Sequence, residues 1–432
     1  MNNSGYLSKI KNLRVVARTS AFSFKGQSLN IRDIGRKLSV DKVLEGSVRK
    51  AGNRLRITAQ LINVEDDTPL WSEQYNRELN DVFAIQDEIT REMIGNLKIK
   101  LLGNEQGDLV KRHTEDPAAH NLYLKGRFFW NKRTESGLKK AIEHFEKAIE
   151  IDPNYAMAYA GISDCNNLLP WYGTVPPKDS HPRAKAAALK ALDIDDGLAE
   201  AHTSLAFAIM QYDWDWEAAE REFKRAIELN RGYAAAHHWY FEYLSAMGRR
   251  DEAMLEVQQA HQLDPLSLII NGALGWAYYF SGQYDLTVEQ SRKTLEMDPD
   301  FLWSRYILGM AYLQISRPDK AVEVLQESTE HAEFRPLIVA VRGAAYGRNG
   351  QRDKALGMLE LLGKHAGENY LLPSYAAMIF LGLGEYERVF ENLEWAFERR
   401  NFWLMFLKAD PFYDVIRGYP EYRTLLKKLK LE

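Results

Sequence analysis

A single interval of 34 residues organises most of this 432-residue chain. Small or apolar side chains return at that step in four separate series, one of which runs through Ala219, Ala253, Thr287 and Ala321. A repeat of this length is one supersecondary unit that cannot bury its apolar face alone, so neighbouring units must stack on each other. The period therefore predicts an elongated array of similar units instead of one globular core.

The residue types in these series predict a pair of antiparallel helices in each unit. Gly275, Gly309 and Gly343 form a second series, and their small size allows two helices to approach closely. A further series through Gly248 and Gly282 falls between the helices. At such a position a left-handed residue ends the first helix without a Cβ penalty. Each unit is therefore expected to be a helical hairpin closed by a glycine turn.

Two stretches, AIEIDPNYAMAYAGIS and AHQLDPLSLIINGALGWAYY, carry the repeat most clearly, and Pro153, Pro265 and Pro299 open turns between units. This pattern resembles the tetratricopeptide repeat (TPR). The resemblance covers roughly residues 118–400, or about eight repeats, and leaves residues 401–432 as C-terminal capping helices. It implies a mainly α fold, a right-handed α-solenoid whose first helices line a concave groove that holds a protein or peptide partner.

The first hundred residues follow a different pattern, with the alternation that is typical of strands. Leu13–Arg18 is expected to form a strand, and Asn30 with Asp33 marks a helix start through a capping box. The segments KVLEGSVRK and RLRITAQLINV predict a β-hairpin, Thr68–Tyr75 adds a third strand, and Asp81–Leu102 forms a long amphipathic helix. The array is therefore expected to follow a small α/β (α+β) domain.

The stretch from NLRVVARTSAFSFKG to VFAIQDEI looks like the TolB amino-terminal-like (FlgO-like) domain, over about residues 7–102. The resemblance implies a bacterial signalling context, because that module accompanies TPR arrays in adenylate cyclases, Ser/Thr kinases and CadC-type regulators. Family members begin with a further strand and helix before the part that matches Leu7. We therefore expect a partial domain at residues 1–104, a linker at 105–117, and an open sheet edge that favours self-association.

No catalytic or metal-binding motif stands in the sequence. P-loop, HExxH, GxSxG, CxxC and dinucleotide GxGxxG patterns are absent, and Cys165 is the only cysteine. His238 and Glu242 lie four residues apart, but a metal site needs at least one more ligand, so a hydrogen-bonding pair is the preferred interpretation. We therefore expect no enzyme activity, no catalytic residues, no metal and no cofactor.

The charge and hydropathy patterns also exclude some partners. Net charge is −4, and the basic bias of residues 1–60 is best explained as a solvated strand face, so no nucleic acid is expected. No apolar run reaches the roughly 18 residues that a membrane span needs. The sequence carries no signal-peptide pattern, so we expect a cytoplasmic location, or a periplasmic one within a larger membrane-anchored regulator.

The concave groove is the predicted binding site. First-helix positions that face the concave side of a TPR superhelix supply mostly aromatic side chains here, namely Tyr123, Trp130, His238, Glu242, Trp276, Tyr279, Phe280, Trp303 and Tyr306. Aromatic side chains gathered on one surface usually mark a partner site, although packing between repeats explains single members equally well. The Lys and Asn residues of chaperone-binding TPRs are missing, which argues against chaperone tails as ligands.

Two functions remain open from the sequence. The preferred hypothesis is a non-catalytic protein- or peptide-binding scaffold with a regulatory or signalling role in bacteria. The alternative is the sensory or regulatory half of an adenylate cyclase or CadC-type transcriptional regulator whose effector domain lies outside this chain. The identity of the partner and the oligomeric state cannot be read from the sequence.

Overall fold

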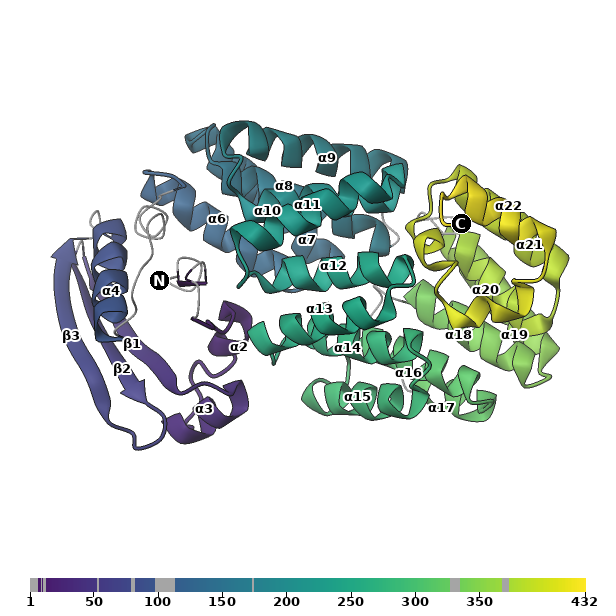
Figure 1. The fold of residues 1–432 in the computed structure, drawn as a ribbon, viewed down its shortest axis with the longest axis horizontal. Helices are drawn as coiled ribbons and strands as arrows, with labels where there is room; N and C mark the ends of the chain where they lie inside the picture. Colours follow the sequence, from purple (N-terminus) through teal and green to yellow (C-terminus); the bar gives the residue numbers. More distant parts are fainter. Residues whose placement is uncertain are drawn as a thin grey trace.

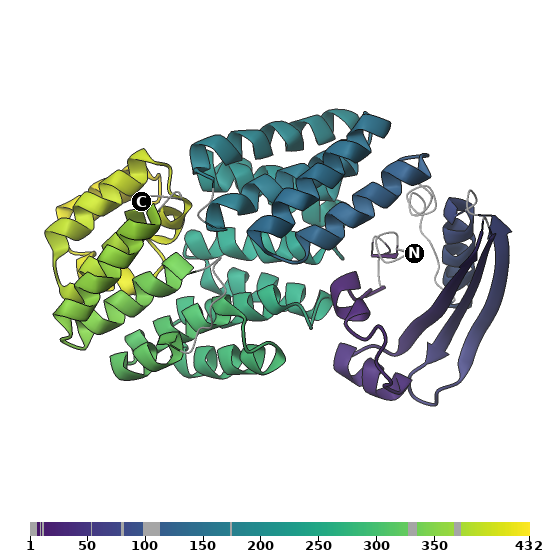
Figure 2. The same ribbon diagram turned by 180° about the vertical axis from the view of Figure 1, so that it is seen from behind.

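A computed structural model of the protein describes residues 7–8, 10, 13–52, 54–78, 82–97, 113–172, 175–326, 335–366 and 373–432. A small sheet lies at one end of the molecule, and the last helices lie at the other (Figures 1 and 2). These last helices are α20 (Pro373–Leu383), α21 (Tyr386–Glu398) and α22 (Pro420–Lys428). Within the described residues, no helix combines the length and apolar character that crossing a bilayer would need.

The sheet consists of three antiparallel strands in the order β1-β2-β3. The strands are β1 (Lys42–Ala51), β2 (Arg54–Asn63) and β3 (Pro69–Glu78). The buried side chains of β2 alternate with exposed ones and pack with Ile85 and Ile89 of helix α4 (Val82–Asn96). These elements confirm the predicted hairpin, third strand and amphipathic helix, although residues 98–102 of that helix lie outside the described part. Within the described residues, β1 and β3 each pair along one side.

The helix predicted near Asn30 also forms. Helix α3 (Ile31–Leu38) begins after Asn30, whose side chain accepts a hydrogen bond from the Asp33 backbone N–H at 2.8 Å. This bond satisfies one of the amide groups that have no partner within the helix itself. The predicted cap at Asn30 is therefore confirmed.

Eight helix pairs occupy residues 117–398 of the described chain. The pairs are α6 (Pro117–Trp130) with α7 (Glu135–Ile151), α8 (Ala156–Leu168) with α9 (Pro177–Ile194), α10 (Ala199–Ala208) with α11 (Trp216–Leu229), α12 (Ala234–Ala246) with α13 (Arg250–Leu263), α14 (Leu268–Phe280) with α15 (Tyr284–Met297), α16 (Leu302–Gln314) with α17 (Pro318–Gln326), α18 (Arg335–Arg348) with α19 (Arg352–Ala366), and α20 with α21. This arrangement confirms the predicted fold class, a helix-pair solenoid preceded by a small α+β region (Figure 1). The exact domain limits, including the linker at 105–117, stay a prediction because residues 98–112 lie outside the described part.

The glycine series behave as their spacing predicts. Gly248, Gly282 and Gly350 all adopt a left-handed backbone, with φ between 70° and 74°, at the turn inside their helix pairs. Gly309 marks a close crossing, because a Cβ atom built there would lie 2.9 Å from the Leu325 side chain. One glycine position therefore closes the helical hairpin, and another lets its two helices touch.

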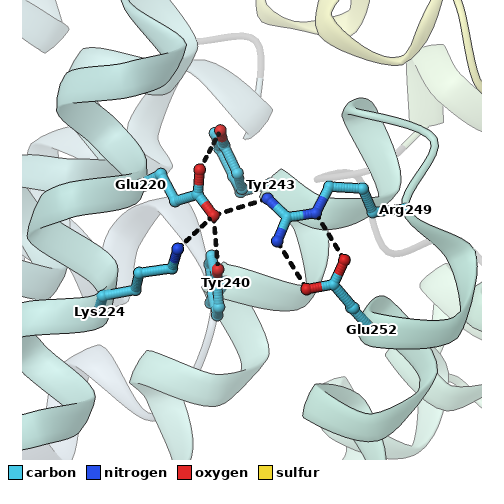
Figure 3. Close-up of polar contacts among 6 residues, drawn as sticks. All are labelled: Glu220, Lys224, Tyr240, Tyr243, Arg249 and Glu252. Atoms are coloured by element: carbon cyan, nitrogen blue, oxygen red, sulfur yellow. Dashed lines mark hydrogen bonds and ion pairs between the residues drawn. The ribbon is translucent and has the colours of Figure 1, made fainter.

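Polar side chains join the third and fourth helix pairs at their surface (Figure 3). The Glu220 carboxylate accepts hydrogen bonds from Arg249 at 2.6 Å and from the Tyr240 hydroxyl at 3.0 Å, and it pairs with Lys224 at 2.9 Å. Arg249 also holds Glu252 through two nitrogens. Burial opposes ionisation of Glu220, but these donors outweigh it and lower its pKa to about 2. The network therefore fixes the angle between neighbouring pairs with charge-assisted bonds.

The predicted strand Leu13–Arg18 is absent. Its residues are extended but lie outside the sheet, and helix α2 (Arg18–Phe22) follows them. The Ala17 backbone N–H donates to the Leu263 carbonyl at 2.7 Å, and the Arg14 guanidinium donates to the Gln262 carbonyl at 2.8 Å. The prediction is wrong because this segment makes its backbone bonds with the turn between α13 and α14 instead of with β1.

A buried serine anchors the same segment on the array. The Ser20 backbone N–H donates to a carboxylate oxygen of Asp264 at 3.0 Å, and the Ser20 hydroxyl donates to the same oxygen. The hydroxyl also accepts from the Leu266 backbone N–H at 2.8 Å. Ser8 lies equally close to another turn, since a Cβ atom built on Gly232 would lie 2.6 Å from its carbonyl oxygen. Ser8 and the segment of residues 13–20 are therefore docked on the array at two turns.

The C-terminal residues fold back towards the middle of the array. Two short 3-10 helices, η4 (Phe402–Phe406) and η5 (Pro411–Ile416), precede α22. The indole N–H of Trp216 on α11 donates to the Leu429 carbonyl at 2.9 Å, and the Arg400 guanidinium lies 4.6 Å from the Trp214 ring. The end of the chain is therefore packed against the third helix pair.

Candidate partner-binding site

The nine residues predicted for the groove lie on four first helices. Tyr123 and Trp130 belong to α6, His238 and Glu242 to α12, Trp276, Tyr279 and Phe280 to α14, and Trp303 and Tyr306 to α16. All nine are buried, and none has an exposed fraction above 8%. Because a partner can bind only to accessible atoms, the question is what covers each of them.

The rings from α14 and α16 come together, as their spacing of one period indicates. Trp276 contacts Trp303 edge to face at 5.0 Å between ring centroids, and Phe280 at 4.9 Å. Trp303 in turn stacks on Tyr306 at 5.1 Å. These separations are typical of favourable aromatic pairs. Adjacent first helices therefore do direct these side chains into one shared space.

The chain itself fills that space with residues 401–416, which we call the C-terminal plug. Phe406 of the plug contacts Trp276 at 4.5 Å between ring centroids and stacks on Phe280 at 5.5 Å. Trp403 lies 6.0 Å from Trp303 and 5.9 Å from Tyr306. The expectation that these rings are exposed is therefore wrong, because the C-terminal segment covers the concave face instead of capping only the last repeat. Their role in partner binding stays a prediction.

A buried polar contact secures the plug. The Tyr279 hydroxyl donates to an Asp410 carboxylate oxygen at 2.8 Å, and Asp410 also accepts from the Phe412 backbone N–H at 2.8 Å. Burial raises the pKa of Asp410 to about 6, while the bonds from Phe412 and Tyr279 oppose that rise. Tyr279, which was predicted as a groove residue, therefore bonds to the chain's own carboxylate.

Sequence reasoning missed Trp171, which belongs to the same aromatic cluster. Trp171 lies in η2 (Leu169–Tyr172), inside the long insertion between α8 and α9. Its ring stacks on Phe402 at 4.4 Å and meets Trp303 edge to face at 6.1 Å. The repeat pattern offers no position for an insertion residue, so no periodic signal pointed to it.

Of the other predicted residues, all but Glu242 face a cavity on the concave side. This N-terminal cavity has a volume of about 820 Å³ and lies between the segment of residues 15–23 and the helices α6, α10 and α12. The predicted residues Tyr123, Trp130, His238 and Trp303 all line it. The structure thus divides the predicted groove into a half filled by the plug and a half that keeps open volume.

A buried ion pair, also missed from the sequence, stands beside the cavity. The Arg127 guanidinium contacts the Asp164 carboxylate of α8 at 2.7 Å, and the Ser204 hydroxyl of α10 donates to the other oxygen. Arg127 also lies 4.0 Å from the Trp130 ring. The sequence feature that could have indicated this contact is the position of Arg127 four residues after Tyr123, which places both side chains on one helical face. This pair ties the first helices of three successive repeats together.

His238 and Glu242 lie close to each other, as predicted. The His238 ring nitrogen Nε2 is 3.4 Å from Glu242 Oε1, and the other carboxylate oxygen has no hydrogen-bond partner among the described residues. Burial lowers the pKa of His238 to about 3 and raises the pKa of Glu242 to about 8. Burial therefore favours the uncharged form of both side chains.

His202, His237 and the cysteine occupy structural positions. His202 and His237 sit at equivalent places, and each ring bonds to a glutamate of the second helix at 2.6 Å. Cys165 is fully buried, and burial raises the pKa of its thiol, so the reactive thiolate is disfavoured. No group of three His, Cys, Asp or Glu residues suited to a metal ion occurs in the described part of the chain.

Comparison with known proteins connects this geometry to repeat proteins. A family model described as "Tetratricopeptide repeat" matches residues 138–155. The chain is 37% identical to the "Putative adenylate cyclase 3" of Rhizobium meliloti over 206 residues. The matched region makes up 47% of this chain and 35% of that protein. The chain is also 22% identical over 235 residues to the transcriptional regulator HilA of Salmonella typhimurium, covering 54% of this chain and 42% of the regulator. The chain thus spans less than half the length of each.

A solved structure supports the same fold. A monomeric mutant of IFIT1 with Gppp-AAAA superimposes with a TM-score of 0.52 and 13% sequence identity, covering 80% of this chain and 76% of that one. At this level of identity the likeness concerns the fold.

Proposed function

We propose that this chain is a tetratricopeptide-repeat protein that acts as a non-catalytic scaffold, and that its N-terminal cavity receives part of a protein or peptide partner. The match of residues 138–155 to the repeat model and the stacked helix pairs support this proposal. The observation that carries the proposal is the open volume of about 820 Å³ on the concave side, at residues that TPR spacing assigns to partner contact. The plug occupies the other half of the concave side, so the first repeats offer the accessible part.

A cross-linking experiment tests this role. A photo-reactive amino acid placed at Leu124, which lines the cavity, is expected to capture a discrete partner in the native cell. The matched control is the same group at Leu255 on α13, which is 66% exposed. Mass spectrometry of the cross-linked species identifies the partner. An identical set of products from both positions, or none from Leu124, would contradict the proposal.

A regulatory role in bacterial signalling is the finer part of the proposal. Its support is the match to an adenylate cyclase and to a transcriptional regulator, each longer than the matched region. The alternative function is therefore the regulatory half of such a protein, with a TolB amino-terminal-like domain at residues 1–104. An open reading frame that continues upstream of Met1 into a cyclase or winged-helix domain would favour this alternative, and a stop codon directly upstream would argue against it.

Action in the cytoplasm and self-association through the sheet belong to the same proposal. Within the described residues, β1 exposes Leu44 and Val48 and has no neighbour strand on its outer edge. An unpaired strand edge can pair with another copy. Sedimentation of the full chain over a range of concentrations is expected to show dimers that Val48→Lys weakens. A monomer at all concentrations would contradict self-association and leave the scaffold role untouched.

A further inference from the structure

We propose that the N-terminal cavity recognises an anionic group of its ligand, a phosphate or a carboxylate, through the guanidinium groups of Arg18 and Arg133. This inference rests on the proposed function, because it names the chemical group that the same site binds. Guanidinium groups match both kinds of anion, since their planar fork can donate two parallel hydrogen bonds to two oxygens.

Three arginines approach the cavity, and one of them is already engaged. Arg18 comes from the start of α2, Arg127 from α6, and Arg133 from the turn after α6, and all three line the cavity. Arg127 is paired with Asp164 at 2.7 Å. Within the described part of the chain, neither Arg18 nor Arg133 makes an ion pair or donates a side-chain hydrogen bond, although both are partly buried. Two guanidinium groups therefore remain free for a ligand.

The local structure holds Arg133 in place before any ligand arrives. Its guanidinium lies 3.8 Å from the Trp130 ring, and that of Arg127 lies 4.0 Å from the same ring. Its backbone has a φ of 51°, in the left-handed region that few residues other than glycine adopt. Cation–π contact and a fixed backbone reduce the rotamer freedom that binding would otherwise remove. Strained backbone at such a position is frequent at binding sites.

Among the described residues, no acidic side chain forms an ion pair with Arg18 or Arg133, although the charge of Arg133 opposes the rise in pKa that burial causes at Asp164, Asp264 and Glu242. Asp264 is bonded to Ser20, and Asp298 accepts the Asp300 backbone N–H within its own turn at 2.9 Å. Glu200 on α10 also lines the cavity but forms no ion pair among the described residues. Burial lowers the pKa of Arg18 and of Arg133. The charge of Arg127 acts in the same direction on both, whereas the charge of Asp164 opposes it at Arg133. Arg18 and Arg133 thus lie in a region of reduced solvation, where an anion would be stabilising.

Two buried polar atoms of cavity residues also have no partner. The indole N–H of Trp130, a side chain only 4% exposed, and the hydroxyl of Tyr233 make no hydrogen bond among the described residues. An indole N–H is a donor only, so it requires an acceptor. Buried polar groups are normally paired, and the exceptions call for a specific explanation. Oxygen atoms of an anionic group in this cavity would supply both acceptors.

Calorimetric titration of the full-length protein tests the inference. The probes are inorganic pyrophosphate for phosphate chemistry and citrate for carboxylate chemistry, each at constant ionic strength. We expect saturable 1:1 binding of at least one probe. In the double variant Arg18→Gln/Arg133→Gln its Kd should rise about tenfold or more, since charge-assisted hydrogen bonds are lost. Arg225→Gln, which removes an exposed arginine on α11, is the matched control and should leave the Kd unchanged.

A second measurement separates loss of binding from loss of fold. Hydrogen exchange at the Ala17 and Ser20 amides, which bond to the array, should slow when the probe binds, because Arg18 belongs to the same segment. The double variant should show the unliganded exchange rates with and without the probe. Absence of saturable binding by both probes, or equal weakening in Arg225→Gln, would overturn the inference. Cross-linking from Leu124 would still report on the scaffold role in either case.

Discussion

The two halves of the concave face use equivalent repeat positions in opposite ways. At α14 and α16 these positions carry Tyr279 and Tyr306, and the C-terminal plug covers them with Asp410 and Trp403. At α6 they carry Tyr123 and Trp130, which line a cavity beside charged residues. The same spacing thus marks a side chain as facing the concave side, but it does not say whether that side is occupied. What occupies it depends on segments outside the repeats.

The largest effect should appear where the plug seals the aromatic rings. Trp276→Ala is expected to lower the free energy of unfolding by about 3–5 kcal/mol, because it leaves a void among rings that are nearly fully buried. Chemical denaturation with Trp fluorescence and circular dichroism measures it. The control is Trp395→Ala on α21, a residue that is 46% exposed and should cost far less. If Trp276→Ala kept wild-type stability, the sealed half would be an open groove after all.

Glu242, which lies 3.4 Å from the cavity residue His238, should produce a large effect that depends on pH. Its pKa is about 8 in the folded chain and near the ordinary value of about 4.5 when unfolded. The folded state thus binds the proton more tightly, so its stability is full below the unfolded pKa and falls as pH rises through the folded pKa. Glu242→Gln, which resembles the protonated form, should be about 3 kcal/mol more stable than wild type at pH 9. The two proteins should differ little at pH 4. Parallel stability curves from pH 4 to 9 would contradict this assignment.

A third variant changes Gly232, which lines the N-terminal cavity. Gly232→Ala places a methyl group against the Ser8 backbone, while Gly418→Ala adds the same group where no atom lies within 4 Å. We expect Gly232→Ala to weaken the docking of Ser8 and of residues 13–20 by about 1–2 kcal/mol through overpacking. Faster hydrogen exchange at Ala17 and Ser20, with an unchanged array, is the readout. Equal exchange in both variants would mean that the segment is not held at this turn.

The smallest difference should separate two tyrosines that have the same chemistry. Tyr279→Phe removes a hydroxyl that donates to Asp410, so it should cost about 1 kcal/mol or slightly more. Tyr233→Phe removes a hydroxyl that has no hydrogen-bond partner among the described residues, so it should be neutral to about 0.5 kcal/mol. Thermal melts of both variants compare them directly. A larger loss in Tyr233→Phe would show that the open half is better satisfied than its contacts indicate.

The sequence was sufficient for features that depend on near neighbours along the chain. The 34-residue series, the left-handed turn at Gly282 and the hairpin of β1 and β2 all follow from local periodicity and turn chemistry. Leu13–Arg18 was mistaken for a strand because alternation indicates an extended backbone but not the element that pairs with it. The actual pairing partner, Leu263, lies in the fourth repeat.

The candidate site was less predictable from the sequence, because its contacts join residues that are far apart along the chain. The grouping of Trp276 and Trp303 followed from the period, but their burial by Phe406 and Trp403 depends on where the chain end packs. Trp171 was missed because it lies in an insertion, which has no position in the repeat. The pair of Arg127 with Asp164 was missed because a contact between successive first helices cannot be read from the spacing within one repeat. Contacts between residues far apart in the sequence decided which concave positions stayed accessible.

The bond from Trp216 to the Leu429 carbonyl spans 213 positions of the chain. Repeat arrays normally gain stability from nearest neighbours, so their ends can fray one unit at a time. Here the last residues are bonded to the third helix pair. The final repeats therefore cannot unfold separately until that contact and the contacts of the plug are broken. Unfolding of this array should therefore be more all-or-none than its linear architecture suggests, and closing so long a loop should slow its folding. The contact of the chain end with the third helix pair is therefore expected to make folding slower and unfolding more cooperative than in an open solenoid.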